Sequence, residues 1–361
     1  MNRPTLSPRS NIKQTRRPFK HRLRSGLDRA AAMTGLMSLF ERRMRRGLTI
    51  LMYHRVLPIE DCRDYPLASL VIPDCAFRTQ VEWLASQCQV LPVAEALAEL
   101  VSGRSSKRPL LSVTFDDGYS DNYSVVAPIL KEHGVRGTFY VTSDFVKNGA
   151  PLWFDQAAFA WEQLDPQDRI RMLNAVEGRD ELAPSREARP TSINAWMAGL
   201  KALAGQQRIE LILQAEESSN GSLDISRCRP MTPAEVIELD RDGHEIGSHS
   251  VTHPILPLLD DSDLAKELSE SAAQLRAWID KPVTGICFPN GDTDARVEHA
   301  VRAAGYRYSG FSNAGINLPD GSQTSLTRIA ITMQRTVDHS GQLDRLGFRS
   351  EVCRFREQLR R

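Results

Sequence analysis

Several features of specialised sequence classes are absent from this chain of 361 residues. No run approaches the roughly 18 uninterrupted apolar residues of a membrane span, so we expect no membrane-spanning helix. Only six cysteines are present, none with C-x-x-C spacing, which argues against a zinc cluster or a redox pair. Their scatter is typical of reduced, mostly buried thiols in a cytosolic protein. Repeats and low-complexity segments are also absent, so the composition is that of an ordinary globular protein.

Net charge is nearly absent as well, but the average hides a division. The chain has 46 Lys and Arg against 45 Asp and Glu. Residues 1–47 contain 13 Lys and Arg and only two acidic residues, Asp28 and Glu41, whereas the rest of the chain carries a net charge of −10. We therefore expect a basic, flexible arm over residues 1–48, ending in a short amphipathic helix, ahead of an acidic body.

The charge of the arm suggests where the protein acts. Residues 15–20 resemble a twin-arginine export signal, but the apolar stretch at 30–40 runs into Glu41 without a small-residue cleavage site. Clustered Lys and Arg each add about 1 kcal/mol of attraction to an anionic membrane surface. We expect a cytoplasmic protein rather than an exported one. The arm is either a plain basic tail or a peripheral contact with the inner face of the membrane. No nucleic-acid partner is expected, because no recognised module accompanies the charge.

The body is predicted to be α/β. Apolar strand patterns alternate with helical periodicity, which indicates βαβ units and a parallel sheet. The predicted strands lie at 49–54, 110–115, 137–142, 244–248, 283–288, 306–311 and 326–331, and the clearest helices at 93–101, 233–241, 264–279 and 294–304. About seven strands favour a distorted (β/α) barrel. We expect one domain over 49–338 with a core at 108–335, a helical insertion at 150–225, and a charged C-terminal tail at 339–361.

Polar side chains stand where the predicted strands end, which is where a β/α barrel places its reacting groups. These residues are His54, Asp116, Asp117, His249, Pro289, Asn290 and Arg328. Asp116 and Asp117 precede Gly118 and form a turn signal. Two adjacent carboxylates at a strand end nevertheless point in different directions, so one can ligate a metal while the other accepts a proton.

A second cluster follows the strand at 244–248. His249 and His253, spaced i and i+4, can hold one metal ion, and the following Pro254 favours a loop over a helix. A borderline metal such as Zn²⁺ prefers His and carboxylate ligands in an open three-ligand site. Asp117 is the third ligand that we expect. Taken singly, each of these groups also fits a structural role.

Together the two clusters have a family resemblance. Thr114-Phe-Asp-Asp-Gly-Tyr119 and His249-Ser-Val-Thr-His253-Pro254 resemble the first two motifs of the NodB-type polysaccharide deacetylases, carbohydrate esterase family 4. The resemblance covers about residues 49–335 and implies a distorted β/α barrel. It implies that Asp116 is the general base and that Asp117, His249 and His253 bind a divalent metal, Zn²⁺ first, with Co²⁺, Ni²⁺ or Mn²⁺ as alternatives.

The remaining motifs depart from the family. Cys287-Phe-Pro-Asn290-Gly291 keeps a Pro-x-Gly core, and the resemblance implies oxyanion or substrate contacts from Tyr119, Pro289 and the backbone N–H of Asn290. Cys287 stands where some members have an Arg that orients the base. Arg328 is the candidate to replace it, with a purely structural Arg as the alternative.

The general acid also stands in an unusual place. The C-terminal Leu326-Thr-Arg-Ile329 run contains no His, whereas Leu51-Met-Tyr-His54 ends the first predicted strand. This order resembles that of the biofilm poly-N-acetylglucosamine deacetylases, in which the histidine that acts as general acid precedes the Asp-Asp motif. The resemblance implies that His54 is the general acid, with a packed strand-end histidine as the alternative.

The resemblance implies a metal-dependent hydrolase that removes N-acetyl groups from an N-acetylated glycan or a lipid-linked oligosaccharide containing N-acetylhexosamine. Three alternatives remain: a xylan-type O-acetyl esterase, a formamide or ring-amide hydrolase, and a catalytically silent carbohydrate-binding protein. The aromatic residues of the insertion either stack on sugar rings or form the core of that segment; they are Trp153, Phe154, Trp161 and Trp196.

Overall fold

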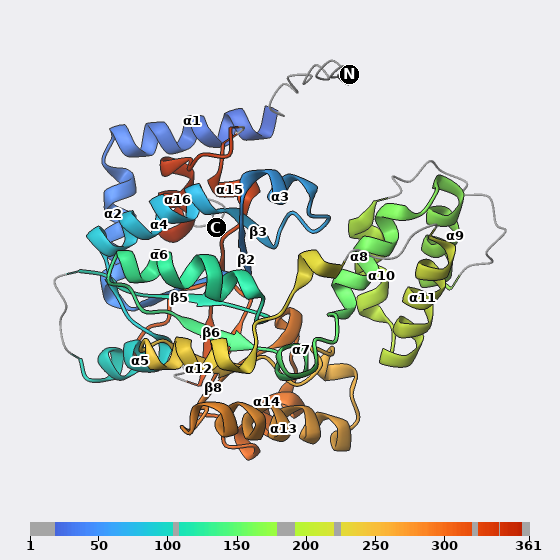
Figure 1. Cartoon of the computed structure of the whole chain (residues 1–361). Coiled ribbons are helices and arrows are strands. Elements are labelled where there is room, and N and C mark those ends of the chain that lie inside the picture. Colours follow the sequence, from blue (N-terminus) through green and yellow to red (C-terminus); the bar gives the residue numbers. More distant parts are fainter. Residues whose placement is uncertain are drawn as a thin grey trace, which may run out of the picture.

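The computed structural model describes residues 19–103, 108–178, 192–219, 225–319, 324–338 and 340–355. Its centre is a nine-stranded parallel sheet with the strand order β10-β9-β8-β7-β6-β5-β1-β11, and with β4 beside β5 (Figure 1). The strands are β1 Leu48–Tyr53, β4 Gln89–Val90, β5 Leu110–Phe115, β6 Thr138–Val141, β7 Glu245–Ser248, β8 Gly285–Cys287, β9 Tyr308–Phe311, β10 Ser325–Thr327 and β11 Ile329–Ala330.

The sheet closes through Arg328. This residue alone separates β10, which pairs with β9, from β11, which pairs with β1. One interrupted segment therefore joins the two edges, and the wall of the barrel has seven strand positions. The (β/α) barrel of about seven strands predicted from the sequence is confirmed. The last strand, predicted as continuous over 326–331, is broken where the Arg328 side chain turns inward.

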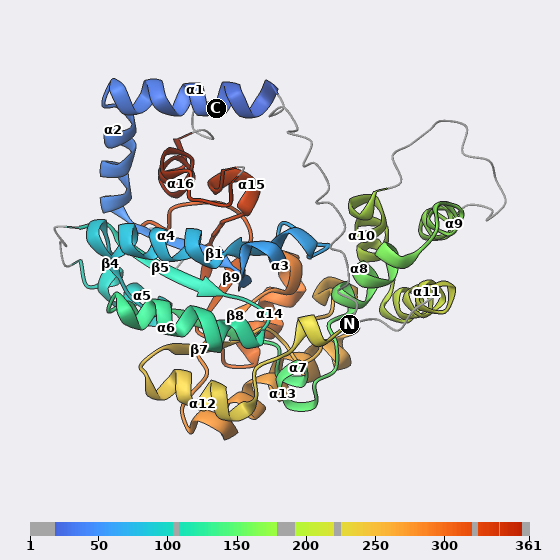
Figure 2. The same ribbon diagram turned by 45° about the horizontal axis from the view of Figure 1, so that its top comes forward.

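Helices cover the outside of the barrel, and Figures 1 and 2 show them around the sheet. They are α4 Asp74–Gln87, α5 Val93–Val101, α6 Ala127–Glu132, α7 Ser143–Asn148, α12 Pro233–Arg241, α13 Asp261–Ile279 and α14 Ala295–Ala303. The helices predicted at 93–101 and 233–241 have the predicted bounds. A short sheet of β2 Arg55–Leu57 and β3 Val71–Pro73, with α3 Ile59–Asp64 between its strands, extends one end.

Aromatic stacking orders the strands that carry the predicted site. The ring of Phe115 on β5 stacks between Tyr53 on β1, at 5.6 Å, and Phe139 on β6, at 5.0 Å. All three side chains are buried in the main hydrophobic core. Stacked aromatic pairs contribute about 0.5–1.5 kcal/mol beyond their buried area. This column therefore holds the ends of three neighbouring strands in one register.

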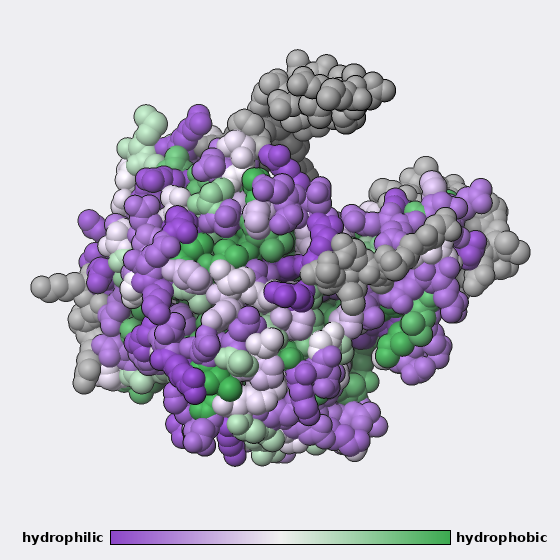
Figure 3. Space-filling model, in the orientation of Figure 1, coloured by the Kyte–Doolittle hydropathy of each residue, from purple (hydrophilic) through white to green (hydrophobic). Residues whose placement is uncertain are grey.

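The predicted helical insertion forms a lobe beside the barrel, on the right in Figure 1. Its helices are α8 Trp153–Gln163, α9 Pro166–Val176, α10 Ile193–Ala202 and α11 Gly205–Ser218. Trp161 and Trp196 stack at 5.8 Å in a hydrophobic cluster of the lobe that extends to Tyr65 and Tyr119 of the barrel. Figure 3 shows a mostly hydrophilic face, with apolar residues over the end of α11, where Ile209 and Leu213 are exposed.

The two ends of the chain pack together. From Phe19 onward the arm forms α1 Phe19–Met33 and α2 Leu36–Arg43, where the sequence predicts a flexible segment with one short helix. Met37 is fully buried, and Glu41 forms an ion pair of 2.8 Å with Arg349. Arg349 lies on α16 Arg345–Val352, within the predicted tail, which is preceded by α15 Met333–Thr336. Burial of apolar side chains explains why these charged segments are ordered.

Among the side chains described from residue 26 onward, Leu27, Met33, Leu36 and Leu39 of α1 and α2 remain exposed. Residues 15–18, with the twin-arginine pair, lie outside the described residues. No helix in the described ranges is long and apolar enough to cross a bilayer. Contact of the arm with an anionic membrane and the location in the cell stay predictions. All six cysteines are unpaired thiols, as predicted.

Candidate metal-dependent active site

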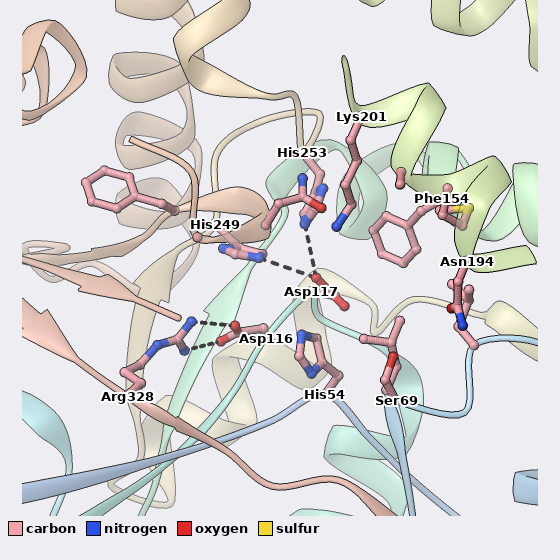
Figure 4. Close-up of a pocket in the computed structure, with 17 residues that line it drawn as sticks. His54, Ser69, Asp116, Asp117, Phe154, Asn194, Lys201, His249, His253 and Arg328 are labelled. Atoms are coloured by element: carbon pink, nitrogen blue, oxygen red, sulfur yellow. Dashed lines mark hydrogen bonds and ion pairs between the residues drawn. The ribbon is translucent and has the colours of Figure 1, made fainter. Parts of the chain in front are cut away.

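The register of the barrel brings the predicted polar residues to one end. Tyr53 pairs with Phe115 in the β1–β5 ladder, so His54 and Asp116 follow neighbouring strands at the same level. In the same way, Ser248 pairs with Val141, which places His249 at the end of β7. Parallel strands end at a common edge, and this edge carries the side chains expected from the sequence (Figure 4).

The turn after β5 separates the two carboxylates. Asp116 continues from the strand, and its N–H donates to the carbonyl of Tyr53. Asp117 has a φ of +79° and Gly118 a φ of +98°, so the backbone reverses its handedness there. A side chain at Gly118 would be strained at this φ and would lie 3.2 Å from Val146. As predicted from the sequence, the two carboxylates face different partners.

Asp117 faces two histidines. Its Oδ1 lies 3.4 Å from Nε2 of His249 and 3.5 Å from Nε2 of His253. The loop carrying the histidines is not helical; Ser250 and His253 have φ of +66° and +59°. The Trp153 indole N–H donates to the carbonyl of His253 at 3.0 Å, so the first helix of the insertion supports this loop.

The protonation of the triad suits a metal ion. Nδ1 of His249 lies 2.8 Å from the Cys287 carbonyl and donates to it, so Nε2 is the nitrogen that faces the site. Burial lowers the pKa of His249, but the Asp117 and Asp116 carboxylates outweigh burial and raise it. Burial lowers the pKa of His253 to about 3, with a further contribution from His249, so its imidazole is neutral. Burial raises the pKa of Asp117, but its contact with His249 and the other nearby histidines outweigh burial and bring the pKa to about 2.

The donor set fits a divalent cation. One ligand atom from each of Asp117, His249 and His253 lies within 4.8 Å of the others, and all three residues are buried. Neither Asp117 oxygen has a hydrogen-bond partner among the described residues. A buried carboxylate with no donor is costly unless a cation compensates it. Two imidazoles and one carboxylate with room for further ligands are typical of catalytic Zn²⁺ sites.

Replacement of Asp117 by Asn tests the triad directly. A metal that binds only the folded state stabilises it by about 4 kcal/mol at 1,000 times its Kd. We expect Zn²⁺ to raise the Tm of the wild type and Asp117→Asn to weaken Zn²⁺ binding by about 100-fold, measured by thermal melts over a Zn²⁺ titration. Asp144→Asn, on a half-buried carboxylate of α7 outside the triad, is the control. An equal Zn²⁺-dependent Tm rise in Asp117→Asn would place the metal elsewhere.

Asp116 pairs with the arginine that the sequence suggested. Nη1 and Nη2 of Arg328 donate to its two oxygens at 2.7 and 2.8 Å, and both side chains are almost completely buried. Arg328 also donates to Thr114 Oγ1 and stacks over the Tyr140 ring. Burial raises the pKa of Asp116, but the Arg328 and His249 charges outweigh it and hold the pKa below its usual range.

Non-glycine residues with left-handed backbone conformations gather at the site, where the last strand is also broken at Arg328. Six non-glycine residues have positive φ in the described ranges, and four of them belong to this site. Those four are Asp117, Ser250, His253 and Asn290. Such residues cost of order 1–3 kcal/mol each and collect at functional sites. The clustering indicates that the fold maintains an unfavourable local geometry to aim these side chains.

The triad and the ion pair line one cavity of about 350 Å³. His54 lines it at the end of β1, and its backbone carbonyl accepts from Asn122 at 2.8 Å. Asn290 lines it from the turn after β8, with a buried Nδ2 that has no partner among the described residues. His54, Asn290, the ion pair and the triad were all expected at this edge of the barrel. Figure 4 shows His54, Asp116 and the triad around a common space.

Two predicted contacts are not brought into the cavity. The Tyr119 side chain is fully buried, with its hydroxyl donating to Asp155 at 2.7 Å and the Arg55 guanidinium 4.4 Å from its ring. Pro289 is buried at the start of its turn, and only its neighbours line the cavity. Tyr119 therefore stabilises the floor beneath the site, because packing and hydrogen bonding consume its side chain.

Several cavity residues were missed from the sequence. Ser69 comes from the connection before β3, and Asn194 and Lys201 from α10. Arg55 and Asp121 form a buried ion pair of 2.9 Å under the site. These five residues lie close to a recognised motif or on an ordinary helix. No spacing in the sequence indicates that the segments carrying them meet at the cavity.

The structure separates the aromatic residues of the insertion into those that form its core and one that lines the cavity. Trp153, Trp161 and Trp196 are buried in the hydrophobic cluster that contains the core of the insertion. Phe154 lines the cavity and packs against His253 at 4.9 Å between ring centroids. The structure therefore assigns three of the four to packing, and leaves Phe154 as the aromatic surface that α8 offers to a ligand.

Comparison with known proteins agrees with this geometry. The sequence profile of the polysaccharide deacetylase family matches residues 103–180 and 194–309, more than half of the chain. YxkH of Bacillus subtilis, assigned as a polysaccharide deacetylase, is 33% identical over 95 residues, which cover 26% of this chain and 31% of that protein. The chain thus aligns with about a third of this curated relative.

Two solved structures show the same fold. The deacetylase PplD of Streptococcus pyogenes superposes with a TM-score of 0.54 at 17% identity, over 80% of this chain and 94% of PplD. IcaB from Ammonifex degensii gives 0.50 at 16% identity, over 80% and 93%. With the profile match over the barrel and its motifs, the chain belongs to the polysaccharide deacetylase family.

Proposed function

We propose that this protein is a divalent-metal-dependent hydrolase that removes N-acetyl groups from a glycan containing N-acetylhexosamine. The observation that carries the proposal is one cavity lined by the Asp117–His249–His253 triad, the Asp116–Arg328 ion pair and His54. A metal site, an ionised carboxylate and a separate imidazole are the groups that hydrolysis of an unreactive amide requires.

The residues divide the work as follows. Asp117, His249 and His253 would hold the cation, which when bound supplies Lewis acidity toward the amide carbonyl and water. Asp116 is the proton acceptor: Arg328 keeps it ionised and fixes its orientation. The unpartnered Nδ2 of Asn290 is a donor for the carbonyl oxygen of the substrate or for a sugar hydroxyl. The backbone N–H of Asn290 stays a predicted oxyanion donor.

His54 supports an amide over an ester as the scissile bond. The departing amine of an amide must be protonated before the C–N bond breaks near neutral pH, whereas an alkoxide leaves an ester more easily. His54 lines the cavity as a residue separate from the base, and we assign it the transfer of this proton to the amine nitrogen. Histidine is the side chain that most often carries out such proton transfers in enzymes.

The test is product analysis with the metal-loaded protein. We expect release of free amine and acetate from N-acetylglucosamine oligomers, detected by amine labelling and mass spectrometry. Deacetylation of acetylated xylan alone would identify an O-acetyl esterase, and release of formate from N-formyl sugars a formamide hydrolase. Glycan binding without turnover of any substrate would favour a silent carbohydrate-binding protein and overturn the proposal.

A further inference from the structure

One face of α10 forms a wall of the cavity. Asn194, Met197, Ala198 and Lys201 all line it, and their i, i+3, i+4, i+7 spacing places them along one side of the helix. The middle of this face is apolar and its two ends are polar. A sugar ring against this wall therefore meets an apolar surface between two hydrogen-bonding groups.

The wall is held in place from behind. The opposite side of α10 carries Trp196, which is fully buried and stacks on Trp161. At the C-terminal end, Arg208 donates to the carbonyls of Leu200 and Leu203 at 3.0 and 2.9 Å. These bonds satisfy backbone groups that a helix end leaves open. Lys201 therefore projects from a fixed turn.

Lys201 directs its ammonium group into the cavity, toward the space beside His253 and Asp117 (Figure 4). No carboxylate of the described residues forms an ion pair with it. Of the two carboxylates that line the cavity, Asp116 is bound by Arg328 and Asp117 faces the histidines. Desolvation lowers the pKa of Lys201 and the Asp292 carboxylate raises it, although the residue as a whole is exposed. Asp292 thus acts on the ammonium without forming an ion pair with it.

The net charge of the cavity also favours an anionic ligand. Its lining carries two carboxylates, Asp116 and Asp117, and two permanent or near-permanent cations, Arg328 and Lys201. A divalent cation on the triad would leave the cavity positively charged. A neutral sugar does not compensate that charge, whereas an anionic substituent does.

We propose that Lys201 forms a subsite for an anionic substituent, a carboxylate or a phosphate, on the N-acetylhexosamine unit. The inference rests on the proposed function and narrows its substrate class from N-acetylated glycans in general to acidic ones. Lys201 is a specificity-determining group here.

Binding by the metal-free protein tests the subsite apart from turnover. The probes are N-acetylmuramic acid for the carboxylate, N-acetylglucosamine 6-phosphate for the phosphate, and N-acetylglucosamine as the neutral sugar. We expect Lys201→Met to weaken binding of one acidic probe by about 10-fold, the equivalent of 1.4 kcal/mol, measured by calorimetry. Binding of the neutral sugar should stay unchanged, and Lys201→Arg should restore the acidic one. The acidic probe that responds identifies the group.

Steady-state kinetics provide the second readout, with Lys147→Met on an exposed lysine of α7 as the matched control. With the metal-loaded enzyme, Lys201→Met should raise KM for the acidic substrate and leave kcat close to the wild-type value. Equal losses of kcat on neutral and acidic substrates would overturn the subsite and make Lys201 part of the catalytic machinery. Unchanged binding and kinetics in Lys201→Met would also overturn it. Absence of turnover in the wild type would contradict the proposed function instead.

Discussion

Asp116→Asn is expected to lower kcat on an N-acetylated glycan by about 10²–10⁴-fold, the usual contribution of a general base. The amide has nearly the shape of the carboxylate but accepts no proton at neutral pH. The metal ligands stay unchanged, because Asp117 faces the histidines on the other side of the turn. The loss should therefore appear in the pre-loaded enzyme at saturating Zn²⁺, measured as amine released per unit time.

Two controls separate lost chemistry from lost structure. Asp116→Asn places an NH₂ group against the Arg328 guanidinium, so its Tm must be measured and the assay run well below it. Asp144→Asn should retain wild-type activity. If Asp116→Asn kept more than a tenth of the activity with the same Zn²⁺ affinity, Asp116 would not be the base, and the role would pass to another cavity group.

Arg328→Met is expected to destabilise the fold by about 3–5 kcal/mol at neutral pH, because it leaves the buried Asp116 carboxylate uncompensated. Urea unfolding at neutral pH measures this loss. The double variant Asp116→Leu/Arg328→Met removes both charges and should recover most of the stability, since apolar replacement of a buried ion pair is often neutral. It should not recover activity. If Arg328→Met were as stable as the wild type, the ion pair would not contribute to the stability of the fold.

The pH dependence of the same variant has a definite sign. Arg328 holds the pKa of Asp116 below its ordinary value, so the pair stabilises the fold above that value and the contribution fades as the pH falls through the folded-state pKa. Without Arg328, burial raises the pKa of Asp116. The acid limb of the kcat/KM profile should move to higher pH, and the destabilisation should be smaller near pH 4 than at pH 7. If the acid limb did not shift in Arg328→Met, Arg328 would not control the ionisation of the catalytic base.

The adjacent carboxylates Asp116 and Asp117 illustrate what can be predicted from neighbouring residues in the sequence. The Asp-Asp-Gly turn after an apolar strand predicted two carboxylates with different directions, because successive side chains diverge where a strand ends. The left-handed conformation of Asp117 confirms it. Likewise, His249 and His253 before a proline predicted a loop that holds both rings together. These features depend on neighbours in the chain, and short-range sterics determine them.

Arg328 and Lys201 show what local sequence leaves open. Arg328 lies more than 200 positions after Asp116, and only closure of the barrel between β10 and β11 brings them together. Lys201 stands on an ordinary amphipathic helix, and only the docking of the insertion turns its face toward the cavity. Tyr119 was expected at the substrate and lies in the floor, because the Asp155 hydrogen bond and the Arg55 contact were invisible in the motif.

The sequence by itself determined the barrel and the residues of the Asp117–His249–His253 triad, because strand periodicity and strand-end motifs are set over a few residues. It also established that a basic arm precedes an acidic body. The tertiary structure alone decided which arginine orients Asp116, which insertion residues reach the cavity, and that the arm packs against α16. Contacts between distant segments depend on the packing of whole elements, and a charge count or a short motif carries no record of them.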